Sequence, residues 1–138
     1  FLLSNYKFIN ESNVSIIFES DYQPKNLFRF INLLPSKSFG INYDTGNSAA
    51  LGLDPIEEIP LYGDRIKNVH IKDRIYKGST VPLQTGNVNF KTVFKQLSLI
   101  SYQGNFILQT ARSTNRNHEV DLSFYRDLTL DWLLHYNL

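Results

Sequence analysis

Short apolar runs alternate with segments of helical periodicity along this chain, and this alternation limits the folds that it can adopt more than any other feature. Four runs have the length and the β-branched or aromatic composition of strands: residues 14–19, 39–44, 66–71 and 106–109. Helical patterns occupy residues 1–10, the segments that begin at Pro24 and Asp54, and residues 90–99 and 121–136. The alternation predicts an α/β protein with a parallel sheet, which is either an open doubly wound sheet or a barrel.

Three of the apolar runs end in a residue type that binds metal ions. Glu19 closes the first run, Asp44 the second and His70 the third. Their spacings are 44 − 19 = 25 and 70 − 44 = 26 residues, close to the roughly 30 residues of one unit in an eight-unit barrel. Parallel strands would present these side chains at one edge, and two carboxylates with an imidazole suit a hard or borderline divalent cation. Because barrels assemble their sites from several strand ends, these residues favour a barrel over an open sheet.

The composition argues against several classes of function. The 138 residues carry a net charge of +1, so the charge gives no support to a nucleic acid partner, which normally requires a basic face. Cysteine is absent, which rules out disulfides and thiolate metal sites and predicts a cytoplasmic location. No apolar run approaches the roughly 18 residues of a membrane span, so we expect a soluble protein without a membrane partner.

Two motifs resemble the xylose-isomerase-like barrels, and specifically their sugar-phosphate isomerase and epimerase branch. They are Tyr43–Asn47 (YDTGN) and Val69–Arg74 (VHIKDR). Val81–Gly86 (VPLQTG) resembles the glycine-rich loop before the seventh helix of that family, and Tyr102 and Gly104 match the turn before its eighth strand. The resemblance extends over nearly the whole chain.

The resemblance implies a (β/α)8 TIM barrel, of which residues 1–138 would form the C-terminal half of a single domain, with strands five to eight. A chain without methionine that opens inside a helical pattern agrees with a fragment of a longer protein. The family also implies a divalent ion (manganese, magnesium, cobalt or zinc) and proton transfer next to a sugar carbonyl through an enediolate. The expected partner is a small-molecule sugar or sugar phosphate, and a homo-oligomer is a further expectation.

The family's site residues carry over one by one. Glu19, Asp44 and His70 fall at its first, second and third metal ligands, while Gln109 stands where the family has a glutamate on strand eight. Glu19 would be base and ligand, and Gln109 a neutral fourth ligand in the catalytic site. Two further departures are Gln84, in place of a loop glycine, and Asn89, in place of an aspartate.

Each assignment has a structural alternative. A glutamate at a strand end also pairs with lysine or caps a helix, an aspartate before Thr-Gly-Asn also forms an Asx-turn, and a lone histidine in a strand is more often a core residue. Four further residues could contact the substrate. Asn47 would bind a hydroxyl or only fix the turn, and Lys72, Arg74 and Arg112 would bind phosphate, which barrels often hold after strands seven and eight, or be ordinary surface charges.

Gln109 separates the functional alternatives. An amide oxygen can coordinate a cation, but it cannot take up a proton near neutral pH. Gln109 therefore favours an isomerisation with one base over an epimerisation with two glutamates. It also leaves open a non-catalytic barrel that binds a sugar phosphate. A relative of the abasic-site endonucleases is a third alternative, which the nearly neutral charge and the scattered remaining histidines disfavour.

Overall fold

A parallel sheet of four strands, in the order β1-β2-β3-β6, forms the centre of the computed structural model, which describes residues 1–138. The strands are β1 (Ile16–Phe18), β2 (Phe39–Asp44), β3 (Ile66–Ile71) and β6 (Asn105–Leu108). β4 (Asp73–Arg74) and β5 (Thr80–Val81) form a separate antiparallel hairpin. All three pairings in the main sheet, β1 with β2, β2 with β3 and β3 with β6, are parallel, so the predicted parallel α/β sheet is confirmed.

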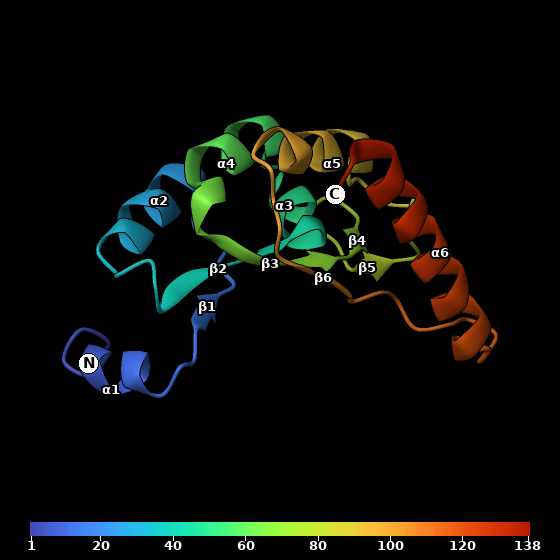
Figure 1. Cartoon of the computed structure of the whole chain (residues 1–138). Coiled ribbons are helices and arrows are strands. Elements are labelled where there is room, and N and C mark those ends of the chain that lie inside the picture. The colour runs from blue at the N-terminus through green and yellow to red at the C-terminus, as the bar shows by residue number, and fades with distance from the viewer.

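The large helices lie on one side of this sheet. The helical segments are α1 (Tyr6–Glu11), α2 (Pro24–Asn32), α3 (Thr45–Leu51), α4 (Pro55–Tyr62), the short 3-10 helix η1 (Gly63–Arg65), α5 (Phe90–Leu99) and α6 (His118–Tyr136). Figure 1 shows α2, α4, α5 and α6 arching over the same face of the sheet. An open doubly wound sheet has helices on both faces, so this arrangement supports the barrel alternative. None of the helices combines the length and apolar character needed to cross a bilayer.

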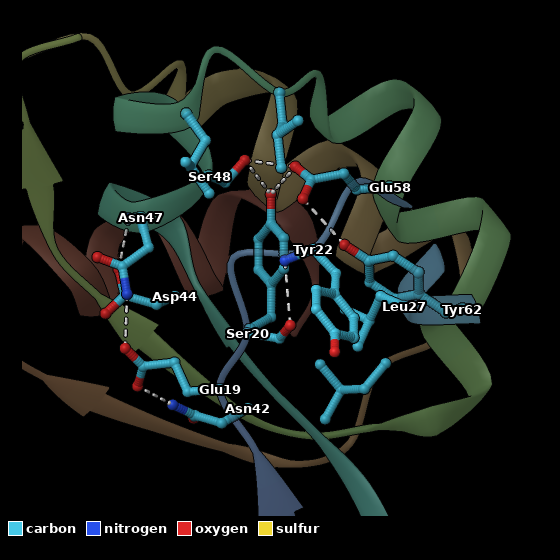
Figure 2. Close-up of a pocket in the computed structure, with 14 residues that line it drawn as sticks. Glu19, Ser20, Tyr22, Leu27, Asn42, Asp44, Asn47, Ser48, Glu58 and Tyr62 are labelled. Carbon is cyan, nitrogen blue, oxygen red and sulfur yellow. Dashed lines mark hydrogen bonds between the residues drawn. The ribbon is translucent and has the colours of Figure 1, made fainter. Parts of the chain in front are cut away.

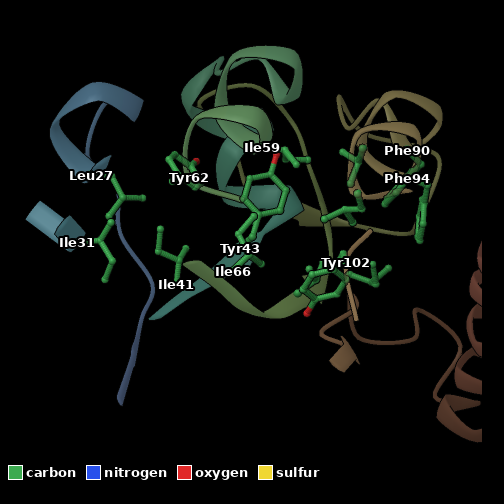
Figure 3. Close-up of a cluster of buried hydrophobic side chains, with 14 of the residues drawn as sticks. Leu27, Ile31, Ile41, Tyr43, Ile59, Tyr62, Ile66, Phe90, Phe94 and Tyr102 are labelled. Carbon is green, nitrogen blue, oxygen red and sulfur yellow. The ribbon is translucent and has the colours of Figure 1, made fainter. Parts of the chain in front are cut away.

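The hydrophobic core fills the space between the sheet and these helices (Figure 3). Ile41 and Tyr43 of β2 and Val69 of β3 point into this core and are buried. Because side chains alternate along a strand, the intervening positions of the same strands face the other way. There the chain places asparagine, aspartate and histidine, so the sheet has one apolar face and one polar face.

Asp73 holds the segment that follows β3 in place. Its side chain is fully buried, and its carboxylate accepts backbone N–H groups of Gly86 at 2.9 Å and Val88 at 3.1 Å. A Cβ atom on Gly86 would lie 2.2 Å from the Asp73 carboxylate, so this close approach requires glycine. The segment expected as a long loop, 72–89, is therefore folded back over the carboxyl end of β3 and includes the β4–β5 hairpin.

Helix α3 is an element that sequence reasoning did not predict. It begins directly after Asp44, whose side chain accepts the backbone N–H of Asn47, and it ends at Gly52 with a φ of 70°. The hydrogen bond that starts an Asx-turn also starts a helix, which is why the sequence suggested only a turn. Helix α4 was predicted from Asp54 and Pro55, and it ends at Tyr62, two residues after Pro60.

Candidate metal centre

The polar face of the sheet brings Glu19, Asp44 and His70 together at the carboxyl ends of β1, β2 and β3. Asp44 and His70 are register partners across β2 and β3, and Glu19 follows β1 directly. One donor atom from each of the three lies within 4.8 Å of the others. Nδ1 of His70 lies 3.4 Å from Oε2 of Glu19 and 3.7 Å from Oδ2 of Asp44. The three side chains can therefore contact one small ligand at the same time.

A register shift between β2 and β3 produces this alignment. Ile41 pairs with Ile66, but Asn42 pairs with Asn68, so Lys67 is passed over. With a continuous register Asp44 would face Val69, and His70 would lie on a different row. A bulge inserts one residue and re-aims the side chains that follow it, and here it places Asp44 opposite His70.

Asp44 uses its two carboxylate oxygens for different purposes. Oδ1 accepts the backbone N–H of Asn47 at 2.7 Å and caps α3. Oδ2 faces the site, 3.4 Å from Nζ of Lys72 and 3.7 Å from Nδ1 of His70. The side chain is 1% exposed. The Asx-turn expected as the structural alternative for Asp44, which here caps α3, and a role in the site are thus compatible, because each needs only one oxygen.

Amide groups hold both oxygens of Glu19 (Figure 2). Nδ2 of Asn47 donates to Oε1 at 2.5 Å, and Nδ2 of Asn42 donates to Oε2 at 2.9 Å. No lysine or arginine pairs with Glu19, and it does not cap a helix. Its side chain is 38% exposed, against 19% for His70 and 1% for Asp44. Glu19 is therefore the most accessible member of the cluster.

The donor atoms of this cluster fit a divalent cation. Carboxylate oxygens and imidazole nitrogen are ligands that zinc, manganese and related ions accept. Two carboxylates are held close together, with only the ammonium of Lys72 near one of them. Like charges at short range repel each other, and a bound cation would relieve that repulsion. Glu19, Asp44 and His70 are the residues that would hold such an ion.

The predicted substrate-binding residues divide into two groups. Lys72 and Arg74 gather at Asn47, where Oδ1 lies 3.5 Å from Nζ of Lys72 and accepts from Nη1 of Arg74 at 2.8 Å. Arg112 does not contact Asn47, but it lines an open pocket of about 590 Å³ together with Lys72 and Gln109. Lys72 thus lies beside Asp44 of the candidate metal centre and also lines this pocket.

Gln109 follows β6 directly, as Glu19 follows β1. Its backbone N–H donates to the carbonyl of Ile71 at 3.0 Å, which places Gln109 at the same edge of the sheet as the cluster. Its side chain is exposed and forms no hydrogen bond within the chain. Its assignment as a fourth ligand stays a prediction.

Sequence reasoning missed three polar residues around the cluster. Asn42 contacts Glu19 and His70. Asn68 donates to Asn42, and the hydroxyl of Thr45 accepts the backbone N–H of Lys72 at 3.0 Å. The first two carried a signal, because Asn42 and Asn68 lie two residues before Asp44 and His70 and so on the same face of otherwise apolar strands.

A buried carboxylate lies behind the site. Glu58 of α4 accepts a hydrogen bond from Tyr43 at 3.1 Å. It also accepts from Tyr62 at 2.9 Å and from Ser48 (Figure 2). Burial raises the pKa of Glu58, and the hydroxyl donors oppose that rise. Burial, together with the charge of Glu58, also raises the pKa of Tyr43 well above its ordinary value. Because Tyr43 and Ser48 flank the Asp44–Asn47 segment, Glu58 connects α4 to the backbone that carries the site.

Comparisons with known proteins agree with this architecture. A family model described as Xylose isomerase-like TIM barrel matches residues 7–128. The chain is 34% identical over 84 residues to the Escherichia coli protein named "Putative L-ribulose-5-phosphate 3-epimerase SgbU", a match that covers 56% of this chain and 29% of that protein. It is 24% identical over 128 residues to an inosose dehydratase of Geobacillus kaustophilus, covering 80% of this chain and 42% of the relative.

Solved structures show the same fold. A xylose isomerase domain protein from Planctomyces limnophilus superimposes with a TM-score of 0.75 at 22% identity, covering 90% of this chain and 48% of that one. A D-tagatose 3-epimerase-like protein superimposes with a TM-score of 0.72, also at 22% identity, covering 98% of this chain and 53% of that one. This chain thus spans about half the length of these structures, and less than half of the two curated relatives.

Proposed function

Because the chain belongs to the xylose isomerase-like TIM barrel family, we propose that it carries the site of a metal-dependent sugar or sugar-phosphate isomerase or epimerase. The observation that carries the proposal is the convergence of Glu19, Asp44 and His70 at one edge of the sheet. The names of the two curated relatives, "Putative L-ribulose-5-phosphate 3-epimerase SgbU" and "Inosose dehydratase", support an enzyme that acts on sugars or related polyols.

Proton transfer is the step that we assign to Glu19. A bound divalent ion would polarise the sugar carbonyl and make the neighbouring C–H proton easier to remove. Glu19 would take that proton, because it is the most exposed carboxylate of the cluster and two amides orient it. The electron pair of the broken C–H bond would form the enediolate. Return of the proton from Glu19 to the adjacent carbon, with transfer of the hydroxyl proton to the former carbonyl oxygen, would then give the isomerised sugar. Asp44 and His70 would serve as ligands.

We infer the reaction type from the chemistry of Gln109. Its amide cannot accept a proton, so the site would have one carboxylate base. An aldose–ketose isomerisation needs only one base, which moves the proton between adjacent carbons on one face of a cis-enediol. A 3-epimerisation returns the proton to the opposite face and would require a second acid from elsewhere. Gln109 therefore favours isomerisation.

Basic residues near the cluster suit an anionic substrate. Lys72 and Arg112 line one pocket beside Gln109, and Arg74 lies next to Asn47. Arginine and lysine bind phosphate through charge-assisted hydrogen bonds. We therefore propose a sugar phosphate as the substrate class, with Lys72 and Arg112 as the first residues to contact the phosphate, and with Asn47 and Arg74 as further substrate contacts.

Two measurements test this function. Metal content comes first: we expect about one divalent ion per chain, lost in His70→Ala and retained in His135→Ala, which changes an exposed histidine of α6. The second is deuterium uptake from solvent at the carbon next to the carbonyl, with ketoses and their phosphates as substrates. If no sugar exchanges its proton in the metal-loaded protein, the proton-transfer assignment is wrong.

A non-catalytic sugar-phosphate-binding protein is the second candidate. The observation in its favour is that the exposed, neutral Gln109 shares a pocket with Lys72 and Arg112, which is an arrangement for binding without proton transfer. Gln109→Glu separates the two candidates. Turnover that appears only in the substituted protein would support the binding function, and turnover in the unchanged protein would exclude it.

A further inference from the structure

Asn42 contacts Glu19 and His70 through a single nitrogen atom. Its Nδ2 lies 2.9 Å from Oε2 of Glu19 and 3.0 Å from Nδ1 of His70. Asn42 is buried, and it lies on the polar face of β2 two residues before Asp44. The roles assigned above use only its hydrogen bond to Glu19, and they give its contact with His70 no part.

Two neighbours determine how the Asn42 amide is oriented. An ionised carboxylate only accepts hydrogen bonds, so the atom that faces Glu19 must be the amide nitrogen. On its other side, Oδ1 of Asn42 accepts from Nδ2 of Asn68 at 2.5 Å. A flipped Asn42 amide would bring two acceptor oxygens together at the Glu19 contact, which is unfavourable.

This orientation selects one tautomer of His70. An amide nitrogen donates and does not accept, so its hydrogen bond to Nδ1 of His70 requires a free lone pair there. The neutral imidazole then carries its proton on Nε2. The carboxylates of Glu19 and Asp44, at 3.4 and 3.7 Å from Nδ1, favour the opposite tautomer, in which Nδ1–H donates to a carboxylate. Asn42 opposes this preference.

We propose that Asn42 is a positioning residue, which keeps Nδ1 of His70 unprotonated and holds Glu19 beside it, so that the cluster is arranged for a divalent cation. The inference rests on the proposed function in that it assigns metal binding to the cluster. If a metal ion were held at Nδ1, Asn42 would lose only its contact with that atom and could keep its hydrogen bond to Glu19. Without Asn42, a charge-assisted hydrogen bond from Nδ1–H to Glu19 would have to break instead, and such bonds are about twice as strong as neutral ones.

The first test reads the tautomer in the metal-free full chain. Long-range proton–nitrogen NMR correlations distinguish an unprotonated Nδ1 from Nδ1–H. We expect Nε2–H in the unchanged protein and a shift to Nδ1–H in Asn42→Ala. A general loss of stability would not produce this change. An Nδ1–H tautomer in the unchanged protein, or Nε2–H in both proteins, would overturn the inference.

The second test measures the affinity for Co²⁺ by calorimetry. We expect Asn42→Ala to bind about tenfold more weakly, the usual effect of removing a group that orients a metal ligand. Asn105→Ala is the matched control, because Asn105 lies on the same row, paired with Asn68, but is exposed and has no side-chain hydrogen bond. Its affinity should not change. Circular dichroism verifies that the variants fold. If Asn42→Ala does not fold, Asn42→Leu, which nearly keeps the side-chain volume, takes its place, and the same loss of Co²⁺ affinity is expected.

The outcomes separate this inference from the proposed function. An unchanged protein that binds no Co²⁺ would contradict the proposed metal site, while the NMR result would still decide the role of Asn42. An unchanged protein that binds Co²⁺ with the same affinity as Asn42→Ala would contradict the role of Asn42 and leave the proposed function standing.

Discussion

Glu58 shows how a single buried residue connects stability to the shape of the candidate centre. No cation lies beside it, and three hydroxyl groups donate to it instead, from Tyr43, Ser48 and Tyr62. A buried carboxylate without a counter-charge is costly in its ionised form, and burial accordingly raises its pKa. The backbone that positions Asp44 is therefore anchored to a group that binds a proton more tightly in the folded state than in the unfolded state.

This difference predicts a pH dependence of stability. The folded pKa of Glu58 is raised, so its contribution is fully present below the unfolded value of about 4.3 and is lost as the pH rises through the folded pKa. Between the unfolded pKa and the folded pKa of Glu58, the free energy of unfolding should fall by up to about 1.4 kcal/mol for each unit by which the pH rises. Glu58→Gln should remove this dependence, which urea denaturation at a series of pH values measures.

The control for this prediction is the exposed neighbour of Glu58 on the same helix. Glu57→Gln removes a similar carboxyl group from the surface of α4, and its stability curve should run parallel to that of the unchanged protein. If the curve of Glu58→Gln also runs parallel, the buried carboxyl does not titrate differently in the two states.

The sequence allowed some residues of the site to be predicted and not others. Glu19, Asp44 and His70 could be named because they end apolar runs, and strand ends meet at one edge of a parallel sheet. Asn42 carried one signal, its place on the same strand face as Asp44, but no local pattern showed its contacts with Glu19 and His70. Glu58 carried none, because two of its three partners, Tyr43 and Ser48, lie in other elements. The pairing of Asn42 with Asn68 depends on the register shift at Lys67, which no local pattern reveals.

At the scale of elements, α3 is the segment that joins the site to the rest of the fold. Its N-terminal residue, Thr45, is 1% exposed, and its hydroxyl lies 2.6 Å from the carbonyl of Lys72 and accepts the N–H of the same residue at 3.0 Å. These contacts fasten the start of α3 to the end of β3. The helix is only seven residues long, so its position depends on such contacts more than on helix propensity.

Replacing this hydroxyl should destabilise the protein. Thr45→Val keeps the shape of the side chain but leaves the backbone N–H of Lys72 without its acceptor, and a buried unsatisfied polar group costs about 1–3 kcal/mol. Thr45→Ser retains the hydroxyl and should recover most of the loss. Chemical denaturation of the three proteins measures the differences. Equal stability of Thr45→Val and the unchanged protein would show that these hydrogen bonds contribute nothing.

Secondary structure could be predicted best where local signals were complete. The bounds of β2, β3 and α5 were predicted as the structure has them, and α5 is capped by Asn89, which accepts from Thr92. The β4–β5 hairpin could not be predicted, because its strands have two residues each and depend on the contacts of Asp73 with a segment more than ten residues away. Long-range contacts thus determine the parts that the sequence did not reveal.

At the scale of the whole molecule, the sheet has two edges. β1 and β6 each pair with one neighbour only, and a closed barrel has no such edges. Apolar side chains are exposed on both strands, with Ile17 at 39% and Ile107 at 47%. The chain spans about half of the solved barrels that it matches, and its helices cover one face of the sheet (Figure 1).

These edges predict self-association of the 138-residue chain when it is studied alone. Unpaired backbone groups and exposed apolar residues of an edge strand pair readily with a second copy, and an inward-pointing lysine opposes this pairing. Ile107→Lys should therefore shift the chain towards the monomer in sedimentation velocity at rising concentration. Ile56→Lys is the control, because it removes an isoleucine that is 56% exposed on α4, away from both edges. A monomeric unchanged chain, or equal effects of the two substitutions, would show that the edges do not drive association.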